Sequence, residues 1–120
     1  MNVDALRGAL EAIDRVLNRG GDADDVLRNV CEILHDRAGY TWVGIELVEG
    51  DDLVLGPSQG GEPPAERTRF PVAYRGNVVA ELSLAGSPGE DEAAFLERVA
   101  TLISPYCLVG WDTGGERWAP

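Results

Sequence analysis

Two cysteines and a single histidine are the residues of this chain best suited to covalent or acid–base chemistry. Cys31 and Cys107 could supply thiolate nucleophiles, and His35 could act as a base. However, both cysteines fall on segments with a helical apolar pattern, where an unpaired cysteine usually serves as a small buried side chain. The spacing indicates no Cys–His pair and no Ser–His–acid arrangement. We therefore expect no nucleophilic catalysis, no metal site and no cofactor.

A second group of polar residues alternates with apolar ones along the segments predicted to be strands. These candidate ligand-binding residues would share one face of a sheet: Trp42, Glu46, Arg69, Glu81 and Ser83. Carboxylates and arginine can hold a polar metabolite through charge-assisted hydrogen bonds. We expect this face to be solvated and to hold no ligand, with Glu46, Arg69 and Glu81 exposed and individually replaceable, and a ligand site is the alternative.

General acid–base catalysis by two carboxylates on that face would require burial that separates their pKa values. A solvated sheet face offers no such burial. We therefore expect the protein not to be an enzyme.

The composition excludes several classes of function. The chain has ten arginines and no lysine, which removes Schiff-base chemistry and the lysine of a phosphate-binding loop. Its net charge of −11 opposes binding to nucleic acid or to an anionic membrane. No segment has the pattern of a signal peptide or of a membrane span, so we expect a cytoplasmic protein. The lysine-free, acidic composition suits either a GC-rich genome or a high-salt habitat.

Two helices are predicted before the first strand. Apolar residues recur at spacings of three and four in a seam that ends before Gly20, formed by Val3, Leu6, Leu10, Ile13 and Leu17. A second apolar face runs from Val26 to Leu34, with Asp22 or Asp24 as the N-cap and an end before Gly39.

Four strands follow, arranged as two hairpins. Alternation from Trp42 to Leu47 predicts a strand, and a turn at 49–52 leads into a second strand at 53–55. After a loop at 60–66, strands at 68–74 and 78–84 are joined by residues 75–77. A three-residue connection pairs Phe70 with Leu82 and places Val79 on the polar face. Pro71 lacks a backbone donor, which favours a sheet edge for its strand.

A third helix and a tail complete the chain. Ser87 as N-cap and Pro88 at the first position start the helix, which is predicted to end or kink near Pro105. We expect residues 1–110 to form one domain and residues 111–120, with Trp111 and Trp118, a tail. The predicted fold class is α+β: a four-stranded antiparallel sheet with two N-terminal helices and one C-terminal helix on one face.

Two stretches carry a resemblance to a known family. Residues 40–60 read YTWVGIELVEGDDLVLGPSQG, and residues 68–86 read TRFPVAYRGNVVAELSLAG before a helix beginning EDEAAFLERVATLIS. Over about residues 23–110 the chain resembles GAF domains, which are small sensory modules related to PAS domains. The first stretch is especially similar to the free methionine-R-sulfoxide reductase branch. The resemblance implies the sheet order 2-1-4-3.

The chain also departs from that family. The resemblance implies about fifty further residues after the second strand, which wall the ligand pocket and hold reactive cysteines in the reductases. Here the short loop at 60–66 takes their place, and the nearby residues are Ala65, Glu66 and Arg67. No catalytic residue of the reductases carries over. The lysine of the cyclic-nucleotide-binding members and the chromophore-bearing cysteine of the phytochrome type have no counterpart.

These observations predict a degenerate GAF-like regulatory or signalling domain that acts as a dimerisation or protein-interaction module. Small-molecule sensing on the polar sheet face is the first alternative, and methionine sulfoxide reduction is the second. A homodimer would use the apolar seam of Leu6, Leu10, Ile13 and Leu17, because a sheet of four short strands covers only about two helices. Alternatively, the seam packs within its own chain.

Overall fold

The computed structural model describes residues 3–110 of the chain, so the predicted tail and its two tryptophans lie outside the described residues. Three helices and four strands follow one another in the predicted order. The strands form a single antiparallel sheet in the order β2-β1-β4-β3, which confirms the expected topology. No helix within residues 3–110 is long and apolar enough to cross a membrane.

The helices begin and end close to their predicted limits. Helix α1 spans Val3–Arg19, and α2 spans Ala23–Asp36 with Asp22 as its N-cap. Helix α3 spans Glu90–Ile103 and passes into a 3₁₀ helix, Ser104–Gly110. The predicted N-cap at Ser87 is wrong. The N-cap is instead Gly89, two residues later, and its backbone N–H donates to the Glu92 carboxylate.

The strands are β1 (Val43–Glu49), β2 (Asp52–Gln59), β3 (Thr68–Tyr74) and β4 (Asn77–Leu84). The predicted pair Phe70 and Leu82 lie opposite each other, and the strand of Pro71 is at an edge. The connection, however, is a two-residue turn at Arg75 and Gly76, both with positive φ.

A β-bulge in β4 keeps the apolar pairs in register despite the shorter turn. The extra residue is Val79, which is 1% exposed and packs in the hydrophobic core. Its predicted place on the polar face is therefore wrong.

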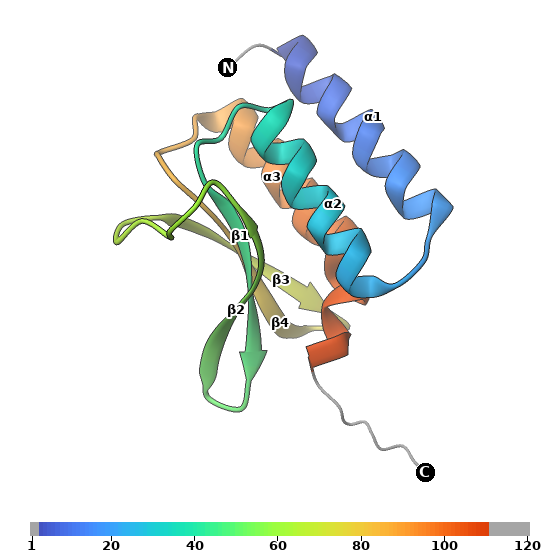
Figure 1. Cartoon of the computed structure of the whole chain (residues 1–120), viewed down its shortest axis with the longest axis vertical. Coiled ribbons are helices and arrows are strands. Elements are labelled where there is room, and N and C mark those ends of the chain that lie inside the picture. The colour runs from blue at the N-terminus through green and yellow to red at the C-terminus, as the bar shows by residue number, and fades with distance from the viewer. Residues whose placement is uncertain (1–2, 111–120) are drawn as a thin grey trace.

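All three helices lie on the same side of the sheet, in two layers (Figure 1). Helices α2 and α3 pack directly on the strands, and α1 packs on those two helices. Leu6, Ala9 and Ile13 of α1 therefore enter the core of their own chain, whereas Leu10 and Leu17 are partly buried at its edge. The face of the sheet that points away from the helices, here called the distal face, carries the predicted polar residues.

Candidate functional site

The distal face is built by the alternation of β1. Val43 and Ile45 point into the helical core, so Gly44 and Glu46 point the other way. In the ladder, Glu46 lies opposite Glu81, and Gly44 lies opposite Ser83. The pairing of β1 with β4 thus brings two of the predicted polar residues, Glu81 and Ser83, next to Glu46.

Glu46 is the centre of a buried polar cluster. Its Oε1 accepts hydrogen bonds from Ser83 Oγ and from Arg69 Nε at 3.0 Å. Its Oε2 accepts from Arg67 Nη2 at 3.2 Å. Glu46 is 5% exposed and Ser83 is fully buried, so the carboxylate is surrounded by partners from its own chain.

Trp42 closes one side of this cluster. The guanidinium of Arg67 lies over the indole ring, 5.5 Å from its centroid, and the indole N–H donates to the carbonyl of Gly61 at 3.2 Å. The indole also occupies the space above Gly44, where a Cβ would come within 2.6 Å of the ring. Glycine at that position therefore allows the indole to pack closely against β1.

The segment 60–67, here called the crossing loop, explains why the cluster is buried. It joins β2 to β3, which are the two opposite edges of the sheet, so it has to pass over the strands between them. It does so at the start of β1, where Gly60 (φ +106°) leaves no room for a Cβ against the Thr41 carbonyl. Arg67 ends the loop, and its Nη1 donates to the Pro64 carbonyl at 3.0 Å.

The charge state of Glu46 follows from these contacts. Burial alone would raise its pKa, but the hydrogen bonds from Ser83 and Arg69 and the charges of Arg67 and Arg69 outweigh it. The pKa of this carboxyl is therefore lowered. The group stays ionised and cannot serve as a general acid near neutral pH.

The structure corrects the prediction of a solvated polar face. Trp42, Glu46 and Ser83 are buried, although Arg69 is exposed and Glu81 is half-buried. Sequence reasoning missed Arg67 because it lies between the predicted loop at 60–66 and the predicted strand at 68–74, and only strand residues were assigned to a face of the sheet. The signal was present, since a short loop between opposite edges of a 2-1-4-3 sheet has to run across it.

The residues suited to covalent chemistry do not form a site. Cys31 and Cys107 are fully buried, and burial raises the pKa of each thiol to about 12. His35 Nδ1 lies 2.9 Å from the carboxylate of the neighbouring Asp36. Within residues 3–110 no group of three His, Cys, Asp or Glu side chains could hold a metal ion. The described part of the chain therefore presents no reactive thiolate at its surface.

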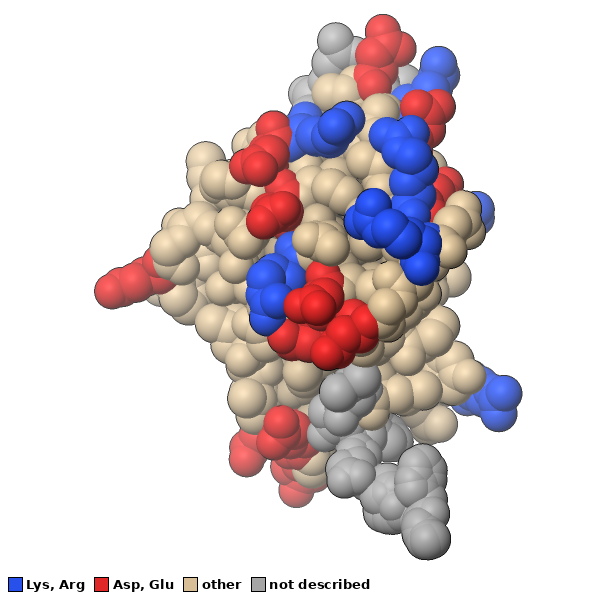
Figure 2. All heavy atoms as spheres, turned by 45° about the vertical axis from the view of Figure 1, so that its right-hand side comes forward, with Lys and Arg blue, Asp and Glu red and all other residues tan. Residues whose placement is uncertain are grey.

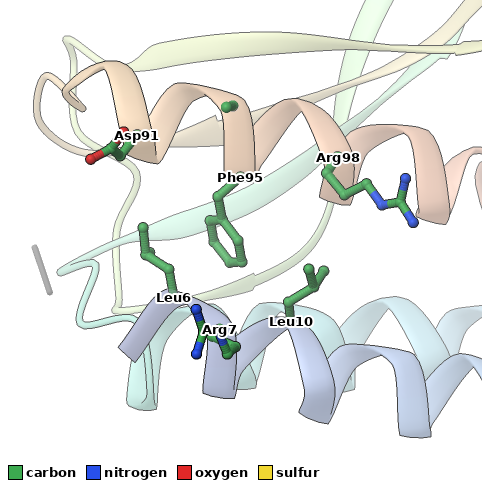
Figure 3. Close-up of a pocket in the computed structure, with 7 residues that line it drawn as sticks. Leu6, Arg7, Leu10, Asp91, Phe95 and Arg98 are labelled. Atoms are coloured by element: carbon green, nitrogen blue, oxygen red, sulfur yellow. The ribbon is translucent and has the colours of Figure 1, made fainter. Parts of the chain in front are cut away.

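The residues predicted for a dimer lie beside a groove. Leu6, Leu10 and Phe95 line an apolar hollow of about 440 Å³ between α1 and α3, with Arg7 and Arg98 at its rim (Figure 3). Leu6 and Ile13 are buried within the chain, so they offer little surface to a partner. Of the predicted seam, Leu6 and Leu10 line this groove, and Leu10 is the more exposed of the two.

Comparisons with known proteins place the fold. No family model matches the sequence, and no curated protein matches it. Among solved structures, the chain is similar to the free methionine-R-sulfoxide reductase of Neisseria meningitidis in complex with its substrate. The TM-score is 0.74 at 19% identity, over 88% of this chain and 89% of that one.

The chain is also similar to the solved structures of two GAF domains, with TM-scores close to that value. The GAF domain of Acinetobacter phosphoenolpyruvate-protein phosphotransferase gives a TM-score of 0.72 at 15% identity, over 96% and 97% of the two chains. The A. aeolicus nlh2 GAF domain in an inactive state gives 0.69 at 12%, over 88% and 96%. The chain therefore has a GAF-like fold.

Proposed function

We propose that this protein is a non-catalytic GAF-like regulatory domain that works by associating with a second copy of itself. The observation that carries the proposal is the closed distal face. Glu46 is the one buried carboxylate of residues 3–110. Its hydrogen-bond donors are Arg67, Arg69 and Ser83 of the same chain. A metabolite that used this carboxylate would first have to displace Arg67.

The buried thiols also support a non-catalytic role. Reduction of a sulfoxide by thiol chemistry needs a thiolate that the substrate can reach. Cys31 and Cys107 are neither accessible nor ionised near neutral pH. We therefore expect no turnover of free methionine sulfoxide.

The groove between α1 and α3 is the surface we assign to the second copy. Its floor is apolar, and its rim offers both signs of charge, with Asp91 as well as Arg7 and Arg98. The surrounding face likewise shows arginine and acidic side chains together (Figure 2). Two copies related by a twofold axis can set opposite charges against each other across such a surface.

Sedimentation equilibrium of the full chain at about 100 µM tests this proposal, because a micromolar dimer is almost fully assembled at that concentration. We expect twice the chain mass of 12.9 kDa, and we expect association to strengthen with salt because each copy carries a net charge of −11. Leu10→Glu should give a folded monomer. Arg15→Glu, a charge change elsewhere on α1, should leave the dimer intact.

A monomer at that concentration would refute the dimer. Native mass spectrometry of protein purified from its own cells tests the closed face separately. A retained small molecule that is lost in Glu46→Gln would instead support ligand sensing.

A further inference from the structure

The edge strand β2 exposes an unusual run of apolar side chains. Leu53, Val54 and Leu55 are 43%, 41% and 41% exposed, and they follow one another in the chain. Only one other large apolar residue of the described chain, Val78, is as exposed. The exposed apolar surface is thus concentrated on one strand and is not scattered over the molecule.

This strand also offers an unpaired backbone. It is an outer strand of the sheet, so its outward N–H and C=O groups pair with no strand of residues 3–110. The turn of the β1–β2 hairpin projects away from the three helices (Figure 1). The bulge at Gly56 and Pro57, which would blunt an edge, lies toward the other end of β2 and leaves Asp52–Leu55 regular.

Both faces of an added strand would find apolar neighbours here. Val54 lies opposite Leu47, which packs toward the helices, and Leu53 and Leu55 lie opposite Val48 and Glu46 on the distal side. An extended peptide laid along β2 would therefore find apolar neighbours for its own apolar side chains on whichever face of the sheet they point to.

The negative charge of the β1–β2 hairpin favours a cationic peptide. Residues 38–66 contain no arginine or lysine and six acidic residues, which are Glu46, Glu49, Asp51, Asp52, Glu62 and Glu66. The three at the hairpin turn, Glu49, Asp51 and Asp52, form no ion pair within residues 3–110. A second copy would bring the same acidic turn and the same net charge to this edge, whereas a cationic peptide complements it.

We propose that β2 is a docking edge for an extended peptide in which apolar residues alternate with lysine or arginine. The peptide adds a strand beside Asp52–Leu55, with its cationic side chains near the acidic turn. This surface is separate from the groove between α1 and α3, so a negative result for one proposal leaves the other unaffected.

The test uses the full chain, labelled with ¹⁵N, and an acetylated, amidated hexapeptide in which lysine alternates with valine. The matched probe has glutamate in place of each lysine. We expect the lysine peptide at about 1 mM to shift and protect the backbone amides of β2, to bind at least about tenfold more tightly than the glutamate peptide, and to weaken with salt.

Substitutions separate the apolar and the charged contributions. Val54→Lys should weaken binding of the lysine peptide by about tenfold or more, because a charged side chain at an edge opposes strand addition. Val78→Lys places the same charge at the other exposed apolar site and should leave binding unchanged. Asp51→Asn together with Asp52→Asn should reduce the affinity and flatten its salt dependence.

Three results would overturn the proposal. The first is an absence of shifts in β2 at that peptide concentration, which needs no variant to fold. The second is equal binding of the lysine and glutamate peptides. The third is protection of the β2 amides that rises with protein concentration without peptide, which would show that a second copy occupies the edge.

Discussion

Replacement of Glu46 by glutamine tests whether the buried cluster is structural. The change removes the charge that pairs with Arg67 and Arg69 while keeping the shape of the side chain. The carboxylate side chain is 6% exposed and that of Arg67 is 18%, whereas that of Arg69 is 42% exposed and contributes less. The Ser83 hydroxyl can still donate to the amide oxygen.

The expected loss follows from these exposures. Breaking a fully buried ion pair by removing one partner costs about 3–5 kcal/mol, and the half-exposed Arg69 places this cluster below that range. We expect Glu46→Gln to lower the free energy of unfolding by about 2–3 kcal/mol. At about 4 °C per kcal/mol for a domain of this size, the melting temperature should fall by about 8–12 °C.

Glu81→Gln is the matched control, because Glu81 lies directly opposite Glu46 in the ladder and forms no ion pair in the described part of the chain. It should change stability by less than about 1 kcal/mol, with a slight gain allowed because two carboxylates face each other. Urea unfolding of both variants and of Arg67→Met gives the comparison. The coupling between Glu46→Gln and Arg67→Met should exceed about 1 kcal/mol.

Equal losses in Glu46→Gln and Glu81→Gln would refute this reasoning. They would show that the crossing loop does not hold Glu46 in solution, and the distal face would then be available to a ligand.

Three further predictions follow from the same geometry. Gly60→Ala should destabilise the fold by more than about 2 kcal/mol, because it adds a clash with backbone to a strained φ, whereas Gly61→Ala adds only the strain, about 1–2 kcal/mol. Urea unfolding separates the two. Cys31 and Cys107 should resist iodoacetamide in the native protein and react at once in urea; rapid native labelling would show that the thiols are accessible. Because the pKa of Glu46 is lowered on folding, its contribution to stability is complete above the ordinary value of 4.5 and is lost as pH falls through the lower folded value. Glu46→Gln should therefore show a weaker loss of stability in that acidic range, and identical pH profiles would contradict the assignment.

The sheet could be predicted well from the sequence because its pattern is redundant. Period-two alternation, the position of Pro71 and the pairing of Phe70 with Leu82 agree on the second hairpin and on an edge position for β3, whereas the order of the four strands was implied by the resemblance to GAF domains. The bulge at Val79 was not predicted, because a three-residue connection and a two-residue turn followed by a bulge both place Phe70 opposite Leu82 and Val72 opposite Ala80. The register of β3 against β4 is the one that buries the apolar pairs Phe70–Leu82 and Val72–Ala80 in the core.

The distal face was predicted wrongly for a different reason. Side chains were assigned to a face by alternation, and exposure was then judged from the strands alone. Burial of Glu46 depends on Arg67, which lies 21 residues further along the chain. The buried face of helix α1 was also predicted incompletely. The predicted seam contained only large apolar residues and left out Ala9 and Ala12, which are buried as well.

The crossing loop has a consequence for how such a domain can change over evolutionary time. It joins the two edges of the sheet over about three strand spacings, roughly 14 Å, with the eight residues 60–67. An insertion between Gly60 and Arg67 would add chain above Glu46 without disturbing any strand pair or any helix. Extra length at this single connection would therefore change what lies above the Glu46 carboxylate, which in this chain is bonded by Arg67 at the end of the loop.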